Sequence, residues 1–177
     1  MPEMLLGAPI ASTIYDDLKK RIAAQKQRGI FPKLSIILIG DHAPSQVYVG
    51  KKQQKAKELG MLCDVHKFDK DADEKTVIHH IKKLNTNNTV SGIIIQLPIP
   101  EHLYTPRVLN AVNPQKDVDC LTNENLGKLI MNTPYLNPPT PAAVLALIQK
   151  TGQKLAGAKV AVVGIGALVG KPLAIML

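Results

Sequence analysis

The feature that most constrains the fold is a strand-length run of mainly apolar residues, LSIILI at residues 34–39, which ends at Gly40. Because such a run has no polar face, the strand that it predicts has to be covered on both sides. Residues 91–98, SGIIIQLP, predict a second strand of the same kind. Strands that are buried on both faces are typical of parallel sheets with helices packed against each side. The two runs therefore favour an α/β fold.

The segments around these runs predict the helices and one more strand. Residues 61–68 alternate in polarity, which predicts a strand nearer an edge of the sheet. The predicted helices span residues 9–28, 44–60 and 73–86. The resulting order, α-β-α-β-α-β, is typical of an open, mostly parallel sheet with flanking helices and right-handed crossovers.

The composition of the 177 residues limits the kind of core and the kind of partner. Hydrophobic residues make up 45% of the chain but aromatic residues only 3%, so the core has to be built from aliphatic side chains. The net charge of +8 is spread along the predicted helices and is not gathered in a tail. With so few aromatic side chains to stack on bases, we expect no nucleic-acid partner. A basic surface also fits small polyanions, such as nucleotides or polyglutamyl chains.

The cysteines and histidines predict neither disulfides nor a metal site. Cys63 and Cys120 are isolated, which is typical of a reduced, cytoplasmic protein. His79 and His80 are adjacent on a predicted helix and point to different sides, so they are a poor metal pair. Residues 1–6 lack the pattern of a signal peptide, and no apolar run approaches membrane-spanning length. We expect a cytoplasmic protein without a membrane partner.

The helix at 44–60 carries the first candidate functional residues. Tyr48 and Lys52 are four residues apart, so their side chains leave the helix on one face. Gln96 follows the predicted strand at 91–98, near the carboxyl ends of the strands, where functional groups collect in such sheets. A solvated helix lysine, like its neighbour Lys51, and a glutamine that only ends a strand remain the simple alternatives.

Residues 98–141 are rich in Pro, Asn and Thr and predict an irregular connection. A short helix is expected near 104–112, and the segment Lys116-Asp117-Val118-Asp119 offers two rival carboxylates. Thr140 is a candidate cap for a helix whose first residue is Pro141. We interpret that helix as a connector between a domain of residues 1–139 and a second, incomplete unit of residues 140–177.

Residues 158–172 predict a strand, a glycine-rich turn and a helix. The glycines are Gly164, Gly166 and Gly170, a variant of the dinucleotide fingerprint with one extra residue before the third glycine. Glycines at such a turn let the backbone approach a pyrophosphate. Because a nucleotide-binding half needs about three more strands to bury its sheet, we expect a longer protein or a partner that completes it. The 177 residues alone are expected to show weak or no dehydrogenase activity.

Four stretches, taken together, resemble the bifunctional methylenetetrahydrofolate dehydrogenase/methenyltetrahydrofolate cyclohydrolase family. Their order and spacing match that family over essentially the whole chain. They are PSQVYVGKKQQKAKELG at 44–60, GIIIQLPIP at 92–100, NPQKDVDCLTNENLGKL at 113–129 and GAKVAVVGIGALVGKPLAIML at 157–177. The resemblance covers the first domain of the family and only the beginning of its cofactor domain, a Rossmann-type dinucleotide-binding domain.

The resemblance implies a reaction and a set of site residues. The expected activity is oxidation of 5,10-methylenetetrahydrofolate with NADP, followed by hydrolysis of the methenyl product to 10-formyltetrahydrofolate. The implied catalytic residues are Lys52, its companion Tyr48, Gln96, which tunes the lysine, and Asp119, which holds the pterin. The segment implied to face the cofactor consists of Gly164, Ile165 and Gly166. The implied partners are tetrahydrofolate derivatives and a second copy of the chain, as a homodimer.

The chemistry accounts for these residue types. A lysine can move protons near neutral pH only if burial or its neighbours, including a cationic substrate, lower its pKa. A glutamine oxygen can orient that lysine without adding charge. A carboxylate can accept hydrogen bonds from the pterin. The runner-up hypothesis is a catalytically silent folate- or nucleotide-binding module of the same fold, and a third is an unrelated nicotinamide-dependent dehydrogenase.

The sequence departs from the family pattern at three places. Cys120 stands where the family usually has Gly, and Pro139 stands where Cys commonly precedes Thr-Pro. The turn Gly164-Ile165-Gly166 stands where many relatives carry Arg or Ala followed by Ser. Because an arginine there would pair with the 2′-phosphate of NADP, its absence leaves the choice between NADP and NAD open.

Overall fold

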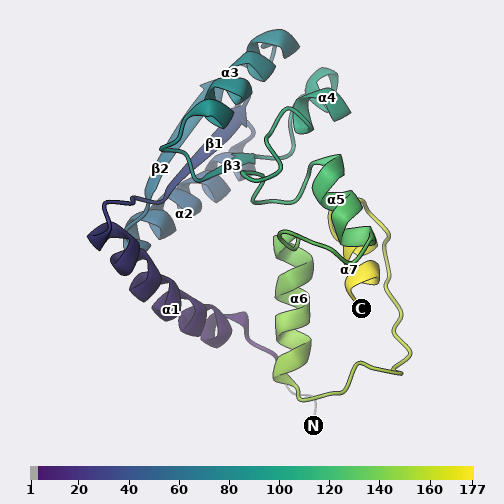
Figure 1. Cartoon of the computed structure of the whole chain (residues 1–177). Coiled ribbons are helices and arrows are strands. Elements are labelled where there is room, and N and C mark those ends of the chain that lie inside the picture. The colour runs from purple at the N-terminus through teal and green to yellow at the C-terminus, as the bar shows by residue number, and fades with distance from the viewer. Residues whose placement is uncertain (1–3) are drawn as a thin grey trace.

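The computed structural model describes residues 4–177 and contains an open, three-stranded parallel sheet (Figure 1). The strands are β1 (Lys33–Ile39), β2 (Leu62–Phe68) and β3 (Gly92–Ile95), and their order across the sheet is β2-β1-β3. Both neighbours of β1 run parallel to it. The three predicted strands and the open parallel arrangement are therefore confirmed.

Helices connect the strands and continue beyond the sheet. Those among the described residues are α1 (Gly7–Gln27), α2 (Ala43–Leu59), α3 (Glu74–Thr86), α4 (Pro106–Leu109), α5 (Asn123–Ile130), α6 (Pro139–Lys150) and α7 (Gly170–Met176), with a 3₁₀ turn η1 (Glu101–Leu103). Within residues 4–177, no helix combines the length and the apolar character needed to span a bilayer.

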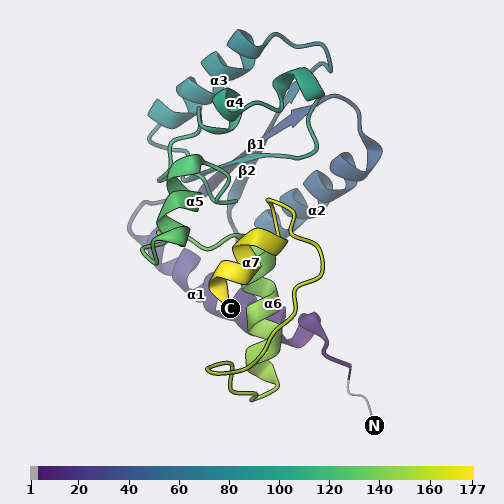
Figure 2. The same cartoon turned by 90° about the vertical axis from the view of Figure 1, so that its right-hand side faces the viewer.

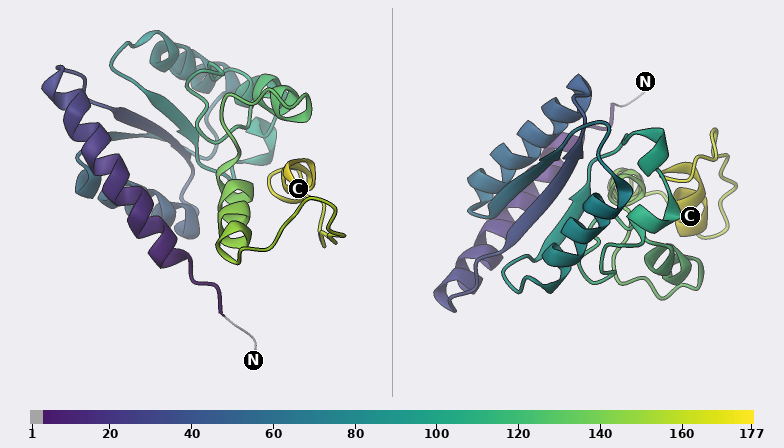
Figure 3. Two further views of the ribbon diagram at one scale, coloured as in Figure 1. Left: turned by 60° about the horizontal axis from the view of Figure 1, so that its bottom comes forward. Right: turned by 90° about the horizontal axis from the view of Figure 1, so that it is seen from above.

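Helices cover the sheet on both faces, as the apolar runs require (Figure 3). On one face α3 and α4 close the larger core, formed by Ile37, Ile39, Val77, Ile81, Leu84, Val90, Ile93, Ile95, Ile99, Leu103, Val108 and Val112. On the other face α2 closes a smaller core, formed by Ile36, Leu38, Val49 and Ile94. The core is aliphatic, as the composition predicts, and α1 packs against α2 on the outside of the smaller core.

Local signals in the sequence explain where two of the helices begin and end. The side chain of Asp73 caps α3 by accepting a hydrogen bond from the backbone N–H of Thr76 at 3.2 Å. Helix α2 ends at Gly60, whose φ of 79° lies in the left-handed region that favours glycine. Gly60 therefore sets where α2 ends, and Asp73 sets where α3 begins.

The predicted helices after the sheet need correction. The helix expected near 104–112 is limited to α4, because the Pro-rich chain before it forms a 3₁₀ turn and Thr105 caps it from outside. Helix α6 begins at Pro139, with Pro138 at the cap position, so Thr140 lies inside the helix and caps nothing. Proline suits the first turn of a helix because its missing N–H would have no partner there.

The strand predicted at residues 158–163 does not form. In the structure this segment has no regular secondary structure and pairs with no strand, and Val163, at a bend, is fully exposed. A strand forms only where a neighbouring chain satisfies its N–H and C=O groups, and the described residues hold no such neighbour for this segment. The predicted helix after the glycine-rich turn does form, as α7, which packs beside α6 (Figure 2).

A buried carboxylate organises the irregular segment that follows α4. Asp117 is 3% exposed, and its Oδ2 accepts hydrogen bonds from the N–H and hydroxyl of Thr122, both at 2.8 Å, and from Asn125 Nδ2 at 3.0 Å. Its Oδ1 accepts a hydrogen bond from the N–H of Leu121 at 3.1 Å. The same segment joins β3, because the N–H of Ile93 donates to the carbonyl of Lys116 at 2.7 Å.

We expect Asp117→Asn to lower the free energy of unfolding by about 3 kcal/mol, because an amide cannot accept all of these bonds and buried donors lose their partners. Urea unfolding measures the change. Asp119→Asn is the matched control, since the structure shows no hydrogen bond to that carboxylate within residues 4–177. An equal loss in both variants would contradict the role given to Asp117.

Two histidines meet between β2 and α3. The ring centroids of His66 and His80 lie 4.6 Å apart, and the Nε2 atoms of both are buried without a hydrogen-bond partner among the described residues. Burial lowers the pKa of His80, and the positive charges of His66, Lys83 and His79 lower it further. The lowered pKa favours the neutral form of the His80 ring.

Acid should weaken the fold through His80. Since the folded-state pKa lies below the ordinary 6.5, the unfolded chain binds this proton first, and stability falls as the pH drops through about 6.5. We expect His80→Gln to reduce the fall in the urea midpoint between about pH 7.5 and about pH 5 by roughly half. His79→Gln, on the exposed side of the same helix, should keep the wild-type slope. If the urea midpoint fell equally with pH in the wild type and in both variants, the explanation through His80 would be wrong.

Candidate functional site

The position of Lys52 on α2 sets it apart from the other lysines of that helix. The buried residues of α2 are Ser45, Val49, Ala56 and Leu59, and Lys52 completes their spacing of four, three, four and three residues. Its side chain thus starts on the inward stripe and is half-buried, whereas Lys51 and Lys57 are exposed. A lysine in a stripe of small and apolar residues is a signal that the sequence already contains.

Gln96 receives the ammonium group of Lys52. The Nζ of Lys52 donates a hydrogen bond to Gln96 Oε1 at 3.0 Å. The amide of Gln96 is oriented by its own Nε2, which donates to the carbonyl of Leu97 at 2.8 Å, and its backbone N–H donates to Ile37 at the end of the β1–β3 pairing. The Leu97–Pro98 peptide that follows is cis. The side-chain oxygen therefore faces the lysine and adds no charge.

The two rival carboxylates have different surroundings. The carboxylate oxygens of Asp117 accept the hydrogen bonds from Leu121, Thr122 and Asn125 described above. Asp119 is half-buried, and burial raises the pKa of its carboxyl, a shift that the negative charge of Asp117 increases and the positive charge of Lys52 opposes. Within residues 4–177 the Asp119 carboxylate accepts no hydrogen bond from the protein, so it is available to a ligand.

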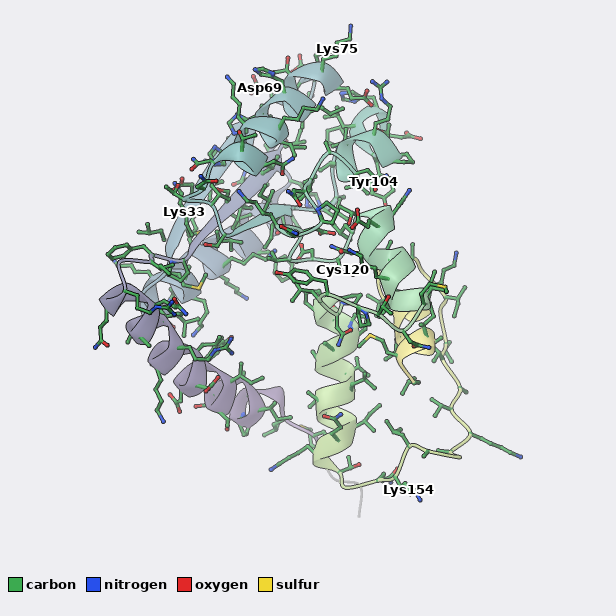
Figure 4. The ribbon with its side chains drawn as sticks, viewed as in Figure 1. Lys33, Asp69, Lys75, Tyr104, Cys120 and Lys154 are labelled. Atoms are coloured by element: carbon green, nitrogen blue, oxygen red, sulfur yellow. The ribbon has the colours of Figure 1, made fainter. Side chains whose placement is uncertain are left out.

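Cys120 turns the chain directly after Asp119. Its φ of 56° lies in the left-handed region, which side chains other than glycine rarely adopt. The side chain is 1% exposed, and burial raises the pKa of its thiol to about 11, so the thiol stays protonated. Cys120 and Tyr104 lie on the side of the sheet that faces α5 and α7 (Figure 4).

Lys52, Gln96 and Asp119 line one cleft of about 360 Å³. The remaining walls come from distant parts of the chain. They are Ile95, Leu97 and Leu121 from the sheet and the loop, Pro138, Pro139 and Thr140 from the start of α6, and Leu168 and Val169 from the turn before α7. The cleft therefore combines a basic, an amide and an acidic side chain with apolar walls, which suits a flat ligand with a polar edge.

Tyr48 lies outside this cleft, at the rim. Its side chain is 60% exposed and lines a second groove, which α1 closes with Tyr15. Lys52 lines both the cleft and the groove. Tyr48 and Lys52 are on one side of α2, as the spacing predicts, but only Lys52 reaches the cleft.

The glycine-rich turn forms a separate hollow of about 540 Å³. Gly164, with φ of 92°, and Gly166 both line it, whereas Ile165 is 56% exposed and lies outside its lining. A Cβ on Gly170 would lie 1.9 Å from the carbonyl oxygen of Gly164, so the close approach of the two ends of the turn excludes any side chain there.

Leu168, Val169 and Thr140 are among the residues of the cleft that were not predicted from the sequence as site residues. Leu168 and Val169 belong to the glycine-rich turn and bring it against the Lys52 cleft, and Thr140 was interpreted as a helix cap. Nothing in their local pattern distinguishes them, because their role comes from a contact between segments far apart in the chain. No cluster of three metal-binding side chains occurs within residues 4–177.

Comparison with known proteins finds a family model that matches each of the two parts of the chain. The family model described as tetrahydrofolate dehydrogenase/cyclohydrolase, catalytic domain, matches residues 5–119. The model described as tetrahydrofolate dehydrogenase/cyclohydrolase, NAD(P)-binding domain, matches residues 138–177. The bifunctional protein FolD of Chlamydia felis is 41% identical over 175 residues, which are 98% of this chain and 60% of that protein.

Solved structures of such enzymes share the fold. The bifunctional enzyme FolD from Campylobacter jejuni superimposes with a TM-score of 0.95 at 30% identity, over 98% of this chain and 62% of that one. The Trypanosoma brucei methylenetetrahydrofolate dehydrogenase-cyclohydrolase, complexed with NADP and an inhibitor, gives 0.93 at 30% identity, over 99% and 61%. The chain thus spans about three fifths of the length of its curated relatives. It belongs to the tetrahydrofolate dehydrogenase/cyclohydrolase family.

Proposed function

We propose that the protein oxidises 5,10-methylenetetrahydrofolate with NADP and hydrolyses the resulting 5,10-methenyltetrahydrofolate to 10-formyltetrahydrofolate, in one-carbon metabolism. The observation that carries this proposal is the 3.0 Å hydrogen bond from Lys52 to Gln96 in a cleft that also holds the free carboxylate of Asp119. Membership of the family and the bifunctional names of the relatives support it.

Asp119 is the proposed anchor of the pterin ring. A carboxylate can accept two parallel hydrogen bonds from the amino group and the adjacent ring N–H of a pterin. The carboxylate of Asp119 is half-buried and unused by the protein, which strengthens such bonds and fixes the orientation of the ring. Its negative charge also balances the methenyl cation that forms during the reaction.

Lys52 is the proposed proton carrier in the hydrolysis. When water adds to the methenyl carbon, its oxygen forms the new bond and the excess proton passes to the neutral amine of Lys52. The lysine then returns that proton to the ring nitrogen as the carbon–nitrogen bond breaks, while the hydroxyl oxygen releases its own proton to the solvent and becomes the carbonyl oxygen of the formyl group on the other nitrogen. Gln96 Oε1 holds the lysine in place through both transfers.

The glycine-rich turn fits a nicotinamide cofactor. Gly164 and Gly166 border a hollow without side chains of their own, so the backbone can approach a phosphate closely. When bound, NADP supplies the acceptor for the hydride of the methylene group. Leu168 and Val169 connect this turn to the wall of the Lys52 cleft, which brings the cofactor segment beside the substrate. We propose Ile165 as part of the same segment.

We propose that Tyr48 stacks on the aromatic part of the folate at the rim of the cleft, since its ring is exposed beside Lys52. The chain is proposed to divide after residue 139 into a folate-binding domain and the beginning of the NAD(P)-binding domain; the start of the second matched stretch at residue 138, two residues before the proposed second unit, supports this division. A homodimer is proposed from the resemblance, and a cytoplasmic location from the free Cys63 and Cys120.

Replacement of Lys52 should abolish the hydrolysis. We expect Lys52→Met to lower the rate of methenyltetrahydrofolate loss by roughly 100- to 10,000-fold, toward the spontaneous rate, because the cleft then lacks the amine that is proposed to accept the proton. The loss of methenyl absorbance measures the rate. Lys57→Met, an exposed lysine of the same helix, should retain the wild-type rate. A wild-type protein that binds folate without turnover would favour the catalytically silent module instead.

Replacement of Asp119 should weaken folate binding. We expect Asp119→Asn to raise the Kd for a tetrahydrofolate analogue by roughly 10- to 100-fold, because charge-assisted hydrogen bonds are lost. Since burial raises the pKa of Asp119, the wild-type affinity should fall on acidification at a higher pH than an ordinary aspartate would give, while the variant should lose this dependence. Calorimetric titration at several pH values measures both effects, and an unchanged Kd would contradict the assignment.

A further inference from the structure

Asp119 lies between two neighbours that are packed into the protein. Before it, Val118 packs against the smaller core, and its side chain fills the space beside Gly92 on β3. After it, Cys120 is 1% exposed. Asp119 itself is half-buried and lines the cleft. Packing therefore holds the backbone on both sides of this carboxylate, and the direction of the carboxylate depends on the conformation of the loop.

Cys120 has a backbone conformation that is costly for a cysteine. Its φ of 56° is in the left-handed region, where a Cβ approaches the following carbonyl oxygen too closely. Among residues 4–177, the other non-glycine residue in this region is Asn132, also with φ of 56°. Strain of this kind persists only where the surrounding structure holds it, and it is concentrated at functional sites.

The hydrogen bonds of the loop require this turn. The N–H groups of Leu121 and Thr122 donate to the carboxylate of Asp117 at 3.1 and 2.8 Å. The chain reaches these positions because it turns back at Cys120, whose own N–H donates to the carbonyl of Asp117 at 3.4 Å. The turn places the Asp117 carboxylate inside the loop and leaves that of Asp119 for the cleft.

The thiol side chain anchors the turn on the side of α4 and α5. Cys120 lines a mainly apolar cavity of about 210 Å³, which Leu109 of α4 and Leu126 of α5 also line. Asp119 lines both this cavity and the cleft. Because burial raises the pKa of the thiol to about 11, the thiol stays protonated and packs as a small apolar group.

We propose that Cys120 is a positioning residue for Asp119: its buried side chain holds the left-handed turn and so presents the carboxylate to the cleft in one orientation. The inference rests on the proposed function, in which Asp119 anchors the pterin. A glycine at this position would adopt the same turn without strain, but it would also allow many other backbone conformations. The ligand would then have to order the loop as it binds, which lowers its affinity.

The first test is the affinity for a tetrahydrofolate analogue, measured by calorimetry. We expect Cys120→Gly to raise the Kd by about three- to tenfold, and Cys120→Ala, which keeps a Cβ but loses the buried sulfur, by about two- to threefold. The kcat for methenyltetrahydrofolate hydrolysis at saturating substrate should stay within about twofold, because Lys52 keeps its hydrogen bond to Gln96. Asn132→Gly is the matched control, since it makes the same backbone change at an exposed residue, and it should leave the Kd unchanged.

The second test needs no folate and follows the carboxyl of Asp119 by carbon-13 NMR. Burial raises the pKa of this carboxyl, the negative charge of Asp117 raises it further, and the positive charge of Lys52 opposes the shift. If Cys120→Gly frees the loop, water reaches the carboxyl and its pKa falls toward the ordinary value of 3.8. In Asn132→Gly the pKa should stay as in the wild type.

Each outcome decides for or against the positioning role. Where the wild type binds the analogue, an unchanged Kd in Cys120→Gly, or an equal loss of affinity in Asn132→Gly, would overturn the proposal. If Cys120→Gly does not fold, Cys120→Ala carries both tests, and an unchanged Kd in that variant would overturn it. If the wild type binds no folate, the proposed function fails, and the pKa of Asp119 alone then decides: a fall in Cys120→Gly supports the role, and no change refutes it.

Discussion

The buried carboxylate of Asp117 holds together the part of the chain that has no regular structure. Four hydrogen bonds connect it to Leu121, Thr122 and Asn125, and the backbone beside it is bonded to β3. Asp119 follows two residues later and owes its place opposite Lys52 to this framework. A group that takes no part in the proposed reaction thus fixes the position of one that does.

The cleft depends on three segments that meet only in the folded chain. Helix α2 supplies a lysine from its inward stripe, β3 ends in the glutamine that orients it, and the loop of Asp117 presents the acid. The turn before α7 closes the remaining side with Leu168 and Val169. The polar groups differ in how the protein uses them: the lysine and the glutamine bind each other, whereas the carboxylate of Asp119 has no protein partner and is left for a ligand.

Much of the fold could be predicted from the sequence because the apolar runs at 34–39 and 92–95 have to be buried on both faces. The strand expected at 158–163 was wrong, since strand formation depends on a neighbour and not only on local pattern. Lys52 and Gln96 were candidates from their positions in the sequence, the resemblance added Asp119 and the roles of all three, and the structure brings them together, although their roles stay predictions. The position of Tyr48 at the rim was not predicted. A spacing of four residues places two side chains on the same side of a helix, but it does not show which of them points into a cleft.

Neither edge of the three-stranded sheet favours the addition of a fourth strand. The edge strand β2 carries charged side chains, since Asp64 forms an ion pair with Lys33 of β1 and Lys67 is exposed. Charged side chains on an edge strand discourage a further chain from adding there. Along the outer side of β3, the loop at Lys116 already occupies the N–H of Ile93, and Val118 fills the space beside Gly92. A strand formed by residues 159–163 would therefore have to find its hydrogen-bond partners away from β3, so the glycine-rich turn belongs to a layer that this sheet does not extend.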